Sequence, residues 1–174
     1  MDTGKNTVEK SRGWYPKGDE DPLTHWVSGE ANHGGMFEMP VITHVKDNLW
    51  QGGYVPDIDL GDAFDVIVSM YPWGKWKAKA DYSEFTMYDG LFMDDQTLFK
   101  AVAVVEEALA EGKRVLVHCQ AGLNRSSLVV ATVLIRQGMS ADEAITLIRD
   151  RRSPTCLCNG TFDKWLRAYG ENRK

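Results

Sequence analysis

Ten consecutive residues, His118 to Ser127 (HCQAGLNRSS), hold the reactive groups with the clearest chemical role in this sequence. Cys119 and Arg125 are separated by five residues, and Gly122 between them allows a backbone geometry that a larger side chain would obstruct. A cysteine thiolate is a strong nucleophile, and an arginine guanidinium can bind two oxygens of a tetrahedral anion at once. The pattern therefore predicts a loop that binds a phosphate group above a cysteine nucleophile.

The segments on either side of this loop have the composition of a buried strand and a buried helix. Residues 114–119 (RVLVHC) form a short apolar run, and residues 125–137 form an apolar stretch that stops at Gly138. A loop between a strand end and a helix start directs several backbone N–H groups into one concavity, where the helix dipole adds positive potential. We therefore expect the phosphate to be bound by Arg125 and by the loop residues Gln120, Ala121, Gly122, Leu123 and Asn124.

The same positive potential gives the neighbouring side chains their expected roles. It favours the thiolate form of Cys119, which can then attack a bound phosphate in line. Ser126 can donate its hydroxyl to the sulfur and stabilise it as a leaving group. His118 is expected to orient the loop through hydrogen bonds, because a stabilised thiolate needs no adjacent base.

These residues resemble the signature of the cysteine-dependent protein tyrosine phosphatase superfamily, His-Cys-x5-Arg-Ser/Thr, without a gap. Residues 42–53 (ITHVKDNLWQGG) resemble the strand pair that opens a dual-specificity phosphatase domain, and residues 151–162 resemble its closing segment. The likeness covers about residues 41 to 170. It implies an α/β fold with a central, mostly parallel sheet of four to five strands flanked by helices.

The resemblance also implies an activity. Such enzymes hydrolyse phosphotyrosine, and in some cases phosphoserine and phosphothreonine, in proteins or peptides through a cysteinyl-phosphate intermediate, without a metal or another cofactor. The closing segment departs from the family, because Cys156-Leu157-Cys158-Asn159 stands where Pro-Asn is more usual. No phosphotyrosine-recognition loop of the large tyrosine-specific enzymes is found, so the motifs do not decide between substrates.

The proton donor of such a reaction should be an aspartate on a loop above the phosphate site. Asp89 follows a predicted strand at residues 84–88, as the general acid of the family does, and would serve as acid and then as base. Asp94 and Asp95 are the competitors. Their position directly before an apolar helical stripe, which stops at Gly112, suits helix capping instead.

Three further features leave alternatives open. Cys156 and Cys158 either resolve an oxidised Cys119 or are ordinary thiols. Residues 71–79 (YPWGKWKAK) alternate aromatic and basic groups, and either contact a substrate or pack on the domain while the lysines stay in water. The basic run at residues 149–152 is a solvated helix end from which one arginine could reach the loop.

Other functions compete with the first interpretation. Gly-x-Asn-Arg-Ser also resembles RNA triphosphatases of the same superfamily, so an RNA 5′-phosphatase or a phosphoinositide phosphatase is the main alternative. A rhodanese-type sulfurtransferase also uses a cysteine in a loop before a helix, but Arg125, Ser126 and Asp89 favour phosphate. A phosphate-binding module without activity is the remaining class, although this chain keeps both the cysteine and the arginine.

Composition limits the class of protein. With 174 residues and 43% hydrophobic content, the chain is long enough for one compact domain. The 20 basic and 25 acidic residues give a net charge of -5, which argues against a nucleic-acid partner. Three cysteines form neither a disulfide framework nor a zinc site, no histidine spacing suggests a metal, and no apolar stretch is long enough for a membrane span. We expect a cytoplasmic protein.

The chain divides into two parts at about residue 40. Residues 1–40 carry three of the six prolines, and we expect a disordered start followed by an extended arm that wraps the domain from about Trp14 onward. Residues 41–174 are the expected catalytic domain. Further strands are predicted at residues 40–45, 49–53 and 64–70, and further helices at about 140–151, opened by a capping box at Ser140, and 161–169.

Overall fold

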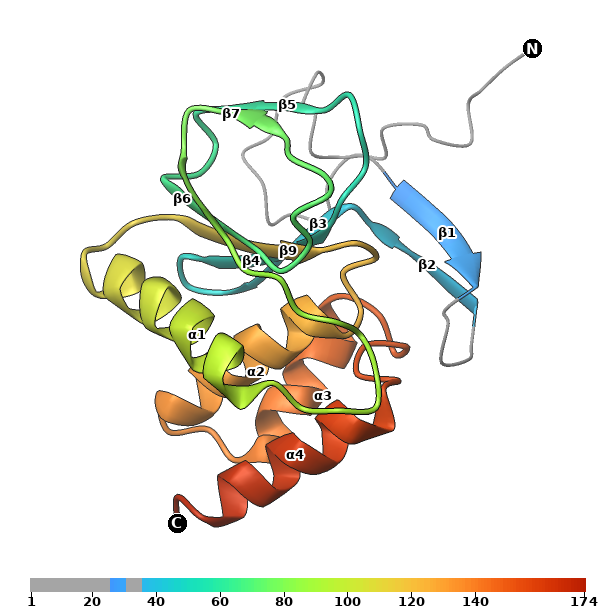
Figure 1. The fold of residues 1–174 in the computed structure, drawn as a ribbon, viewed down its shortest axis with the longest axis vertical. Helices are drawn as coiled ribbons and strands as arrows, with labels where there is room; N and C mark the ends of the chain where they lie inside the picture. Colours follow the sequence, from blue (N-terminus) through green and yellow to red (C-terminus); the bar gives the residue numbers. More distant parts are fainter. Residues whose placement is uncertain (1–25, 31–35) are drawn as a thin grey trace.

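The structure is a computed structural model in which residues 26–30 and 36–174 are described. The described part of the N-terminal segment forms two antiparallel strands, β1 (Trp26–Glu30) and β2 (Met36–Pro40), which the sequence pattern did not predict. The expected disordered start and the packing of the arm at Trp14 lie outside the described residues. From β2 the chain passes directly into the central sheet (Figure 1).

The centre of the domain is a five-stranded sheet in the order β3-β4-β9-β6-β8. Its strands are β3 (Ile42–Lys46), β4 (Leu49–Gly53), β6 (Val66–Ser69), β8 (Asp81–Glu84) and β9 (Val115–Cys119). Only β3 runs antiparallel to its neighbour. The predicted mostly parallel sheet is therefore confirmed, and every residue of its middle strand β9 is buried, as its apolar run indicated.

The parallel strands bring their carboxyl ends to one edge of the sheet. Gly53 of β4 pairs with Cys119, and Ser69 of β6 pairs with His118. Functional groups of parallel α/β sheets gather at this edge, where strands turn into loops and helices begin. The predicted phosphate loop follows β9 at this position.

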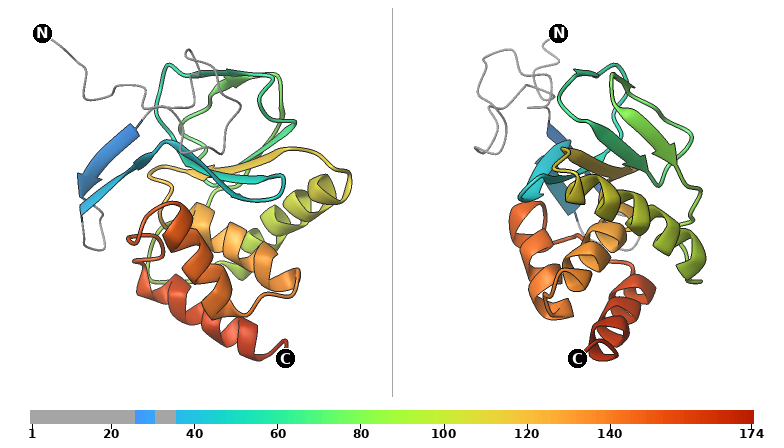
Figure 2. Two further views of the ribbon diagram at one scale, coloured as in Figure 1. Left: turned by 180° about the vertical axis from the view of Figure 1, so that it is seen from behind. Right: turned by 90° about the vertical axis from the view of Figure 1, so that its left-hand side faces the viewer.

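The part of the chain that the structure describes also contains four helices: α1 (Asp95–Ala110), α2 (Arg125–Arg136), α3 (Ala141–Arg151) and α4 (Gly160–Glu171). Figures 1 and 2 show all four on the same side of the sheet, with α1, α2 and α3 against the strands and α4 packed on α2 and α3. The first eleven residues of α2 are buried, which explains the mostly apolar sequence from Leu128 to Ile135. The capping box at Ser140 and Glu143 is present, so that prediction is confirmed.

The opposite face of the sheet is covered by the chain between β4 and β8. This segment contains a small parallel pair, β5 (Asp59–Gly61) and β7 (Lys77–Ala78), that the sequence analysis did not predict. It packs a second apolar cluster on the sheet, formed by Val41, Ile42, Ile58, Leu60, Phe64, Ile67, Trp76 and Leu116. Short strands with polar neighbours carry too weak a period to be recognised from sequence.

One predicted strand is wrong in position. The sequence indicated a strand at residues 84–88, whereas β8 ends at Glu84. The edge strand β8 is polar, with exposed ends and a half-buried middle, while the apolar residues that suggested the strand, Phe85 and Met87, lie in the irregular segment after it. Among the residues that the structure describes, no helix is long and apolar enough to cross a membrane.

Candidate active site

The loop between β9 and α2 turns its carbonyl groups away from the predicted phosphate position. Tyr54 N–H donates to the carbonyls of Cys119 and Gln120 at 3.0 and 2.8 Å. The carbonyl of Leu123 accepts from the N–H of Leu157 at 2.8 Å. Because successive carbonyls point outward, the N–H groups between them face the concave side of the loop. We call this concavity, formed by residues 119–125, the cradle.

Two buried polar side chains hold the middle of the cradle from behind. Arg152 donates from Nε to the carbonyl of Gly122 at 2.7 Å and from Nη2 to that of Ala121 at 3.4 Å. Gln51 donates from Nε2 to the same Gly122 carbonyl at 3.0 Å. Gly122 has a φ of +73°, and a Cβ there would lie 2.7 Å from the carbonyl of Gly52 and against Arg152. Only glycine fits this position.

Arg152 also ties the cradle to the start of the sheet. Its Nη1 donates to the carbonyl of Pro40 and to Thr43 Oγ1, both at 2.9 Å. Burial lowers the pKa of this guanidinium, with the nearby Cys156 and Cys119 acting in the opposite direction. The arginine remains a cation, so it supplies a buried positive charge behind the cradle. The sequence prediction that one arginine of residues 149–152 reaches the loop is thus met by Arg152.

The sulfur of Cys119 lies at the floor of the cradle between two polar groups. The Gly122 N–H donates to Sγ at 3.2 Å, and the Ser126 hydroxyl lies 3.3 Å from Sγ. Only 2% of the cysteine is exposed. Gln51 Nε2 also contacts the hydroxyls of Ser126 and Ser127 at 3.2 and 2.6 Å, so the oxygen beside the sulfur is held in place. The Gly122 N–H donates to the sulfur, and the Ser126 hydroxyl, which accepts from the thiol, can donate to the sulfur once the thiol proton has left.

Arg125 enters the site as the first residue of α2. Its side chain is buried, and Nη1 donates to the carbonyl of Met87 at 3.2 Å. Its Nε is buried and has no hydrogen-bond partner among the described residues. A buried donor without a partner is costly, so the guanidinium is set up for an acceptor outside the described residues, such as a bound anion. The ring of Tyr71 lies against it, 5.7 Å from the guanidinium carbon.

His118 is enclosed by aromatic side chains on the face of the sheet opposite the helices. Its Nε2 lies 2.9 Å from the hydroxyl of Tyr82, and its Nδ1 lies 3.3 Å from the Cys119 carbonyl. The ring centroid of Trp76 is 4.7 Å away. Burial lowers the pKa of His118 to about 4 and raises the pKa of Tyr82 to about 12, so both are neutral at pH 7. A neutral histidine bonded to the backbone fits the expected orienting role.

The carboxylate of Asp89 is brought to the cradle by two asparagines. Asn124 donates from Nδ2 to one carboxylate oxygen at 3.0 Å, and Asn159 donates from Nδ2 to the other at 2.7 Å. Asn159 also donates to the carbonyl of Gly90 at 2.9 Å. The segment after β8 is therefore held next to Asn124, the residue that precedes α2, although Asp89 and Asn124 are far apart in sequence.

The side chain of Asn124 does not have the role that the sequence analysis expected. We expected it to bind the phosphate together with the other loop residues. In the structure its amide is occupied by Asp89, by the N–H of Asn159 at 2.9 Å and by Cys158 Sγ at 3.4 Å. This also explains why α2 has no side-chain cap at its N-terminus. Only the backbone of Asn124 remains free to contribute to the cradle.

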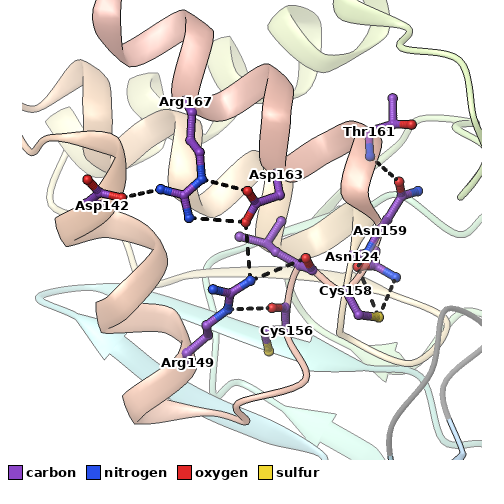
Figure 3. Close-up of polar contacts among 10 residues, drawn as sticks. Asn124, Asp142, Arg149, Cys156, Cys158, Asn159, Thr161, Asp163 and Arg167 are labelled. Carbon is purple, nitrogen blue, oxygen red and sulfur yellow. Dashed lines mark hydrogen bonds and ion pairs between the residues drawn. The ribbon is translucent and has the colours of Figure 1, made fainter.

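The loop that carries Arg152 and Asn159 is itself fixed by Arg149 (Figure 3). Arg149 donates from Nε to the Cys156 carbonyl at 3.0 Å and from Nη2 to Asp163 of α4 at 3.2 Å. Cys156 is fully buried, and burial raises the pKa of its thiol. Its sulfur lies 3.9 Å from the Gly122 carbonyl, so it packs behind the cradle. All three cysteines are free.

The structure shows where Asp94 and Asp95, the competitors of Asp89, lie, and which residues of the aromatic segment 71–79 are buried. Asp94 accepts the Thr97 N–H at 3.0 Å and caps α1, while Asp95 is the first residue of that helix, as the sequence indicated. Of the two tryptophans in residues 71–79, Trp76 is buried and donates to the Val55 carbonyl at 2.6 Å, whereas Trp73 is 59% exposed. Trp76 therefore packs on the domain, whereas Trp73 is exposed to solvent.

Sequence reasoning missed the contributions of Gln51, Tyr82 and Asn159 to the site. A signal existed for Gln51, because a polar residue inside an apolar, glycine-rich strand needs buried partners. Asn159 belonged to the recognised closing segment, but its partner Asp89 is distant in sequence. Among the described residues, no group of three or more His, Cys, Asp or Glu side chains could hold a metal ion, and independence from metal stays a prediction.

Comparison with solved structures gives the same fold. The crystal structure of human DUSP28 matches with a TM-score of 0.64 at 21% identity, covering 77% of this chain and 95% of that one. The structure of a human protein described as tyrosine phosphatase-like serine/threonine/tyrosine-interacting protein matches with a TM-score of 0.61 at 17% identity, covering 76% and 97%. These likenesses confirm the fold class that the sequence predicted.

Sequence relatives match over a shorter region. Human dual specificity protein phosphatase 16 is 41% identical over 78 residues, which is 44% of this chain and 12% of that protein. The tyrosine-protein phosphatase yvh1 of Schizosaccharomyces pombe is 40% identical over 65 residues, 37% of this chain and 19% of that protein. The chain spans less than a fifth of the length of these two relatives.

A protein-family comparison covers more of the chain and includes the whole cradle. The model of the dual specificity phosphatase catalytic domain matches residues 78–172, more than half of the 174 residues. The matched region contains Asp89, Cys119, Arg125, Arg152 and Asn159, whose side chains the structure brings together. The resemblance indicated by the sequence motifs is confirmed, and the chain belongs to the family of dual specificity phosphatase catalytic domains.

Proposed function

We propose that this protein is a phosphatase that hydrolyses phosphate monoesters through a cysteinyl-phosphate intermediate. One observation carries the proposal: the Cys119 sulfur lies between the Gly122 N–H and the Ser126 hydroxyl in a cradle whose Arg125 has a buried Nε without a partner among the described residues. A tetrahedral dianion supplies the acceptor that Arg125 lacks. The sulfur is then the nucleophile beneath it.

The first step forms the covalent intermediate. Cys119 Sγ attacks phosphorus, the bond from phosphorus to the ester oxygen breaks, and Asp89 gives its proton to that oxygen. Arg125 and the cradle N–H groups stabilise the charge on the transferred phosphoryl oxygens.

The second step returns the enzyme to its starting state. Asp89, now a carboxylate, accepts a proton from a water molecule as the water oxygen attacks phosphorus. The bond from phosphorus to sulfur breaks, inorganic phosphate forms, and the hydroxyl of Ser126 donates to the departing thiolate. His118 stays neutral and holds the start of the loop through the Cys119 carbonyl, so it takes no proton in either step.

Phosphorylated proteins or peptides are the proposed substrates, with phosphotyrosine first and phosphoserine and phosphothreonine as an extension. The names of the relatives as dual specificity and tyrosine phosphatases support this class. The loop side chains Gln120, Ala121 and Leu123 are uncharged, which disfavours a highly charged inositol headgroup. We further propose a reducing, cytoplasmic location, because Cys119 must be a free thiol to react. We also propose that residues 41–174 form the catalytic domain.

A substrate panel tests the proposal. Phosphotyrosine, phosphoserine and phosphothreonine peptides, phosphoinositides, RNA with a 5′-triphosphate, and thiosulfate with cyanide are offered to the chelator-treated protein. We expect release of phosphate from the phosphotyrosine peptide above all others, unchanged by EDTA. Faster turnover of phosphoinositide or RNA would select the main alternative, and thiocyanate formation without phosphatase activity would select sulfur transfer.

A further inference from the structure

A row of three aromatic side chains begins at the phosphate clamp and continues to the surface. Tyr71, whose ring lies against the Arg125 guanidinium, contacts Trp73 edge to face at a centroid distance of 5.4 Å. Trp73 in turn lies 6.3 Å from the ring of Tyr88, which directly precedes Asp89. We call Tyr71, Trp73 and Tyr88 the aromatic row. Its outer members are strongly exposed, Trp73 by 59% and Tyr88 by 73%.

The backbone that presents Trp73 is fixed on both sides. Before it, Ser69 Oγ accepts the Tyr71 N–H at 3.1 Å and donates to the Tyr71 carbonyl at 2.9 Å. After it, Gly74 is buried so closely against Tyr54 that an added Cβ would overlap the tyrosine ring. Trp76 is anchored through its indole N–H to Val55. The exposure of Trp73 is therefore a feature of a well-held segment and not of a loose loop tip.

The position of the row beside the phosphate site indicates which kind of partner would contact it. A substrate phosphate in the cradle lies next to Arg125 and therefore next to Tyr71, and the leaving group lies next to Asp89 and therefore next to Tyr88. The chain on either side of a phosphorylated residue must pass over this rim. Exposed apolar surface beside a binding site marks a contact surface for a partner.

The charges around the row are of both signs, with exposed Lys75, Lys77 and Lys79 after Trp73 and exposed Asp94 and Asp95 after Phe92, so the rim is not a uniformly basic surface for an anionic membrane. Leu91 and Phe92 are also exposed near Asp89, and apolar residues of this kind can enter a bilayer. The exposed carboxylates of Asp94 and Asp95 follow them closely, and they would be repelled by anionic lipid headgroups. A peptide with an apolar side chain meets no such repulsion.

We propose that Trp73 and Tyr88 form a subsite for an apolar or aromatic side chain that neighbours the phosphorylated residue in a peptide substrate. This inference rests on the proposed phosphatase function and adds to it a sequence preference. Aromatic rings held at a fixed position offer contact area at low entropic cost, and one such contact changes affinity by about tenfold. Peptides with glycine at the neighbouring positions would lose this contact.

The test uses two phosphotyrosine peptides that differ only at the residues flanking the phosphotyrosine, leucine or phenylalanine in one and glycine in the other. The full-length wild-type protein is compared with Trp73→Ala and Tyr88→Ala. Phe92→Ala is the matched control, because Phe92 is 89% exposed and lies close in sequence but is not part of the row. The ratio of kcat/KM between the two peptides is measured for each protein.

We expect a preference of about tenfold for the apolar peptide in the wild-type protein and in Phe92→Ala, and loss of most of it in Trp73→Ala and Tyr88→Ala, mainly through KM. Equal ratios in all four proteins would overturn the subsite. Loss of the preference in Phe92→Ala alone would place the contact elsewhere. Weaker binding of Trp73→Ala to phosphoinositide vesicles with no change in peptide preference would overturn it in favour of a membrane.

A binding measurement separates failure of the subsite from failure of the proposed function. Cys119→Ser, alone and combined with Trp73→Ala, is titrated with both fluorescent phosphopeptides, and anisotropy gives the two dissociation constants. If the wild-type protein hydrolyses neither peptide, the proposed function fails. The ratio of the two dissociation constants then still shows whether the subsite binds the apolar side chain. Equal affinity of Cys119→Ser for the two peptides would contradict the subsite independently of turnover.

Discussion

The cradle and the aromatic row differ in how they are built. The cradle consists of seven consecutive residues, and its carbonyl groups are bonded to buried groups behind it, including Arg152 and Gln51. The row joins Tyr71 and Trp73, after β6, to Tyr88, after β8, and its outer rings are exposed. A loop whose carbonyl groups are held from behind permits one geometry and hence one reaction. The exposed side chains of the row can be substituted with little loss of stability, so the preference for one peptide sequence over another can change there.

The largest expected effect concerns the clamp of the cradle. Arg125→Lys should lower kcat/KM on a small aryl phosphate by roughly a thousandfold, because one ammonium cannot bind two equatorial oxygens in the plane of a guanidinium. The measurement is steady-state hydrolysis with circular dichroism as a check on folding. An equally conservative change outside the cradle, Arg136→Lys, should leave the rate unchanged. Retention of most of the wild-type rate by Arg125→Lys would contradict the two-point contact.

The second effect concerns Asp89, which lies between the two regions. Asp89→Asn should lower kcat/KM for a phosphotyrosine peptide by roughly a hundredfold or more, and should slow a difluorinated umbelliferyl phosphate far less, because a stable leaving anion needs no proton. Asp94→Asn and Asp95→Asn are the matched controls. Asp94 caps α1 and asparagine caps a helix nearly as well, so Asp94→Asn should cost well under about 1 kcal/mol of stability, without dependence on the leaving group.

The opposite pattern would move the acid to another residue. If Asp94→Asn or Asp95→Asn showed the leaving-group-dependent loss and Asp89→Asn did not, the segment before α1 would have to fold over the cradle during the reaction. The bonds from Asn124 and Asn159 to Asp89 would then serve only the fold.

A smaller effect is expected from Asn159, which we regard as a positioning residue for Asp89. Asn159→Ser keeps an oxygen that can cap α4 through the Thr161 N–H but removes the amide donor to Asp89. We expect about a tenfold loss on the phosphotyrosine peptide and little loss on the difluorinated substrate. In an Asp89→Asn background the same change should have no further effect. An additive loss in the double variant would show that Asn159 acts independently of Asp89.

The smallest effect on catalysis, and a measurable one on stability, is expected from His118. Its pKa is about 4 in the folded protein, below the ordinary value of 6.5, so the unfolded chain binds a proton that the folded protein does not. The contribution to stability is complete above pH 6.5 and is lost as the pH falls towards 4. Between pH 7 and pH 5 the loss is about 2 kcal/mol.

Urea unfolding at both pH values measures this loss. His118→Gln, which cannot titrate, should lose less stability over the same interval, although it is less stable at pH 7. A change of equal size in both proteins would assign the pH dependence to other groups. Tryptophan is not ionisable, so Trp73→Ala should show the wild-type pH dependence.

The same contrast explains what could be predicted from the sequence. The cradle was predicted because its parts are contiguous and flanked by an apolar strand and an apolar helix with clear periods. The contacts of Asp89 with Asn124 and Asn159, and of His118 with Tyr82, join residues far apart in the chain, and no local pattern encodes them. The small pair β5 and β7 is short and polar, so its pairing depends on the tertiary position of Trp76 and its apolar neighbours.

Asn124 illustrates a second limit of sequence reasoning. Its place in the loop was correct, but the direction of its side chain was decided by partners on two other segments, Asp89 and Asn159. The predicted strand at residues 84–88 failed for a related reason. An edge strand such as β8 needs few apolar residues, and the apolar Phe85 and Met87, half-buried and buried, pack on the core from an irregular segment instead.

The covalent step at Cys119 is the central claim, and it is tested most directly by intact-mass analysis of rapidly quenched reactions with a small aryl phosphate. We expect the wild-type protein to gain the mass of one phosphoryl group on Cys119 during turnover. Cys119→Ser should show neither this gain nor turnover, yet should still bind phosphate, because Arg125 and the loop N–H groups remain. Wild-type turnover without a phosphorylated Cys119, or undiminished turnover by a clean Cys119→Ser preparation, would contradict the account.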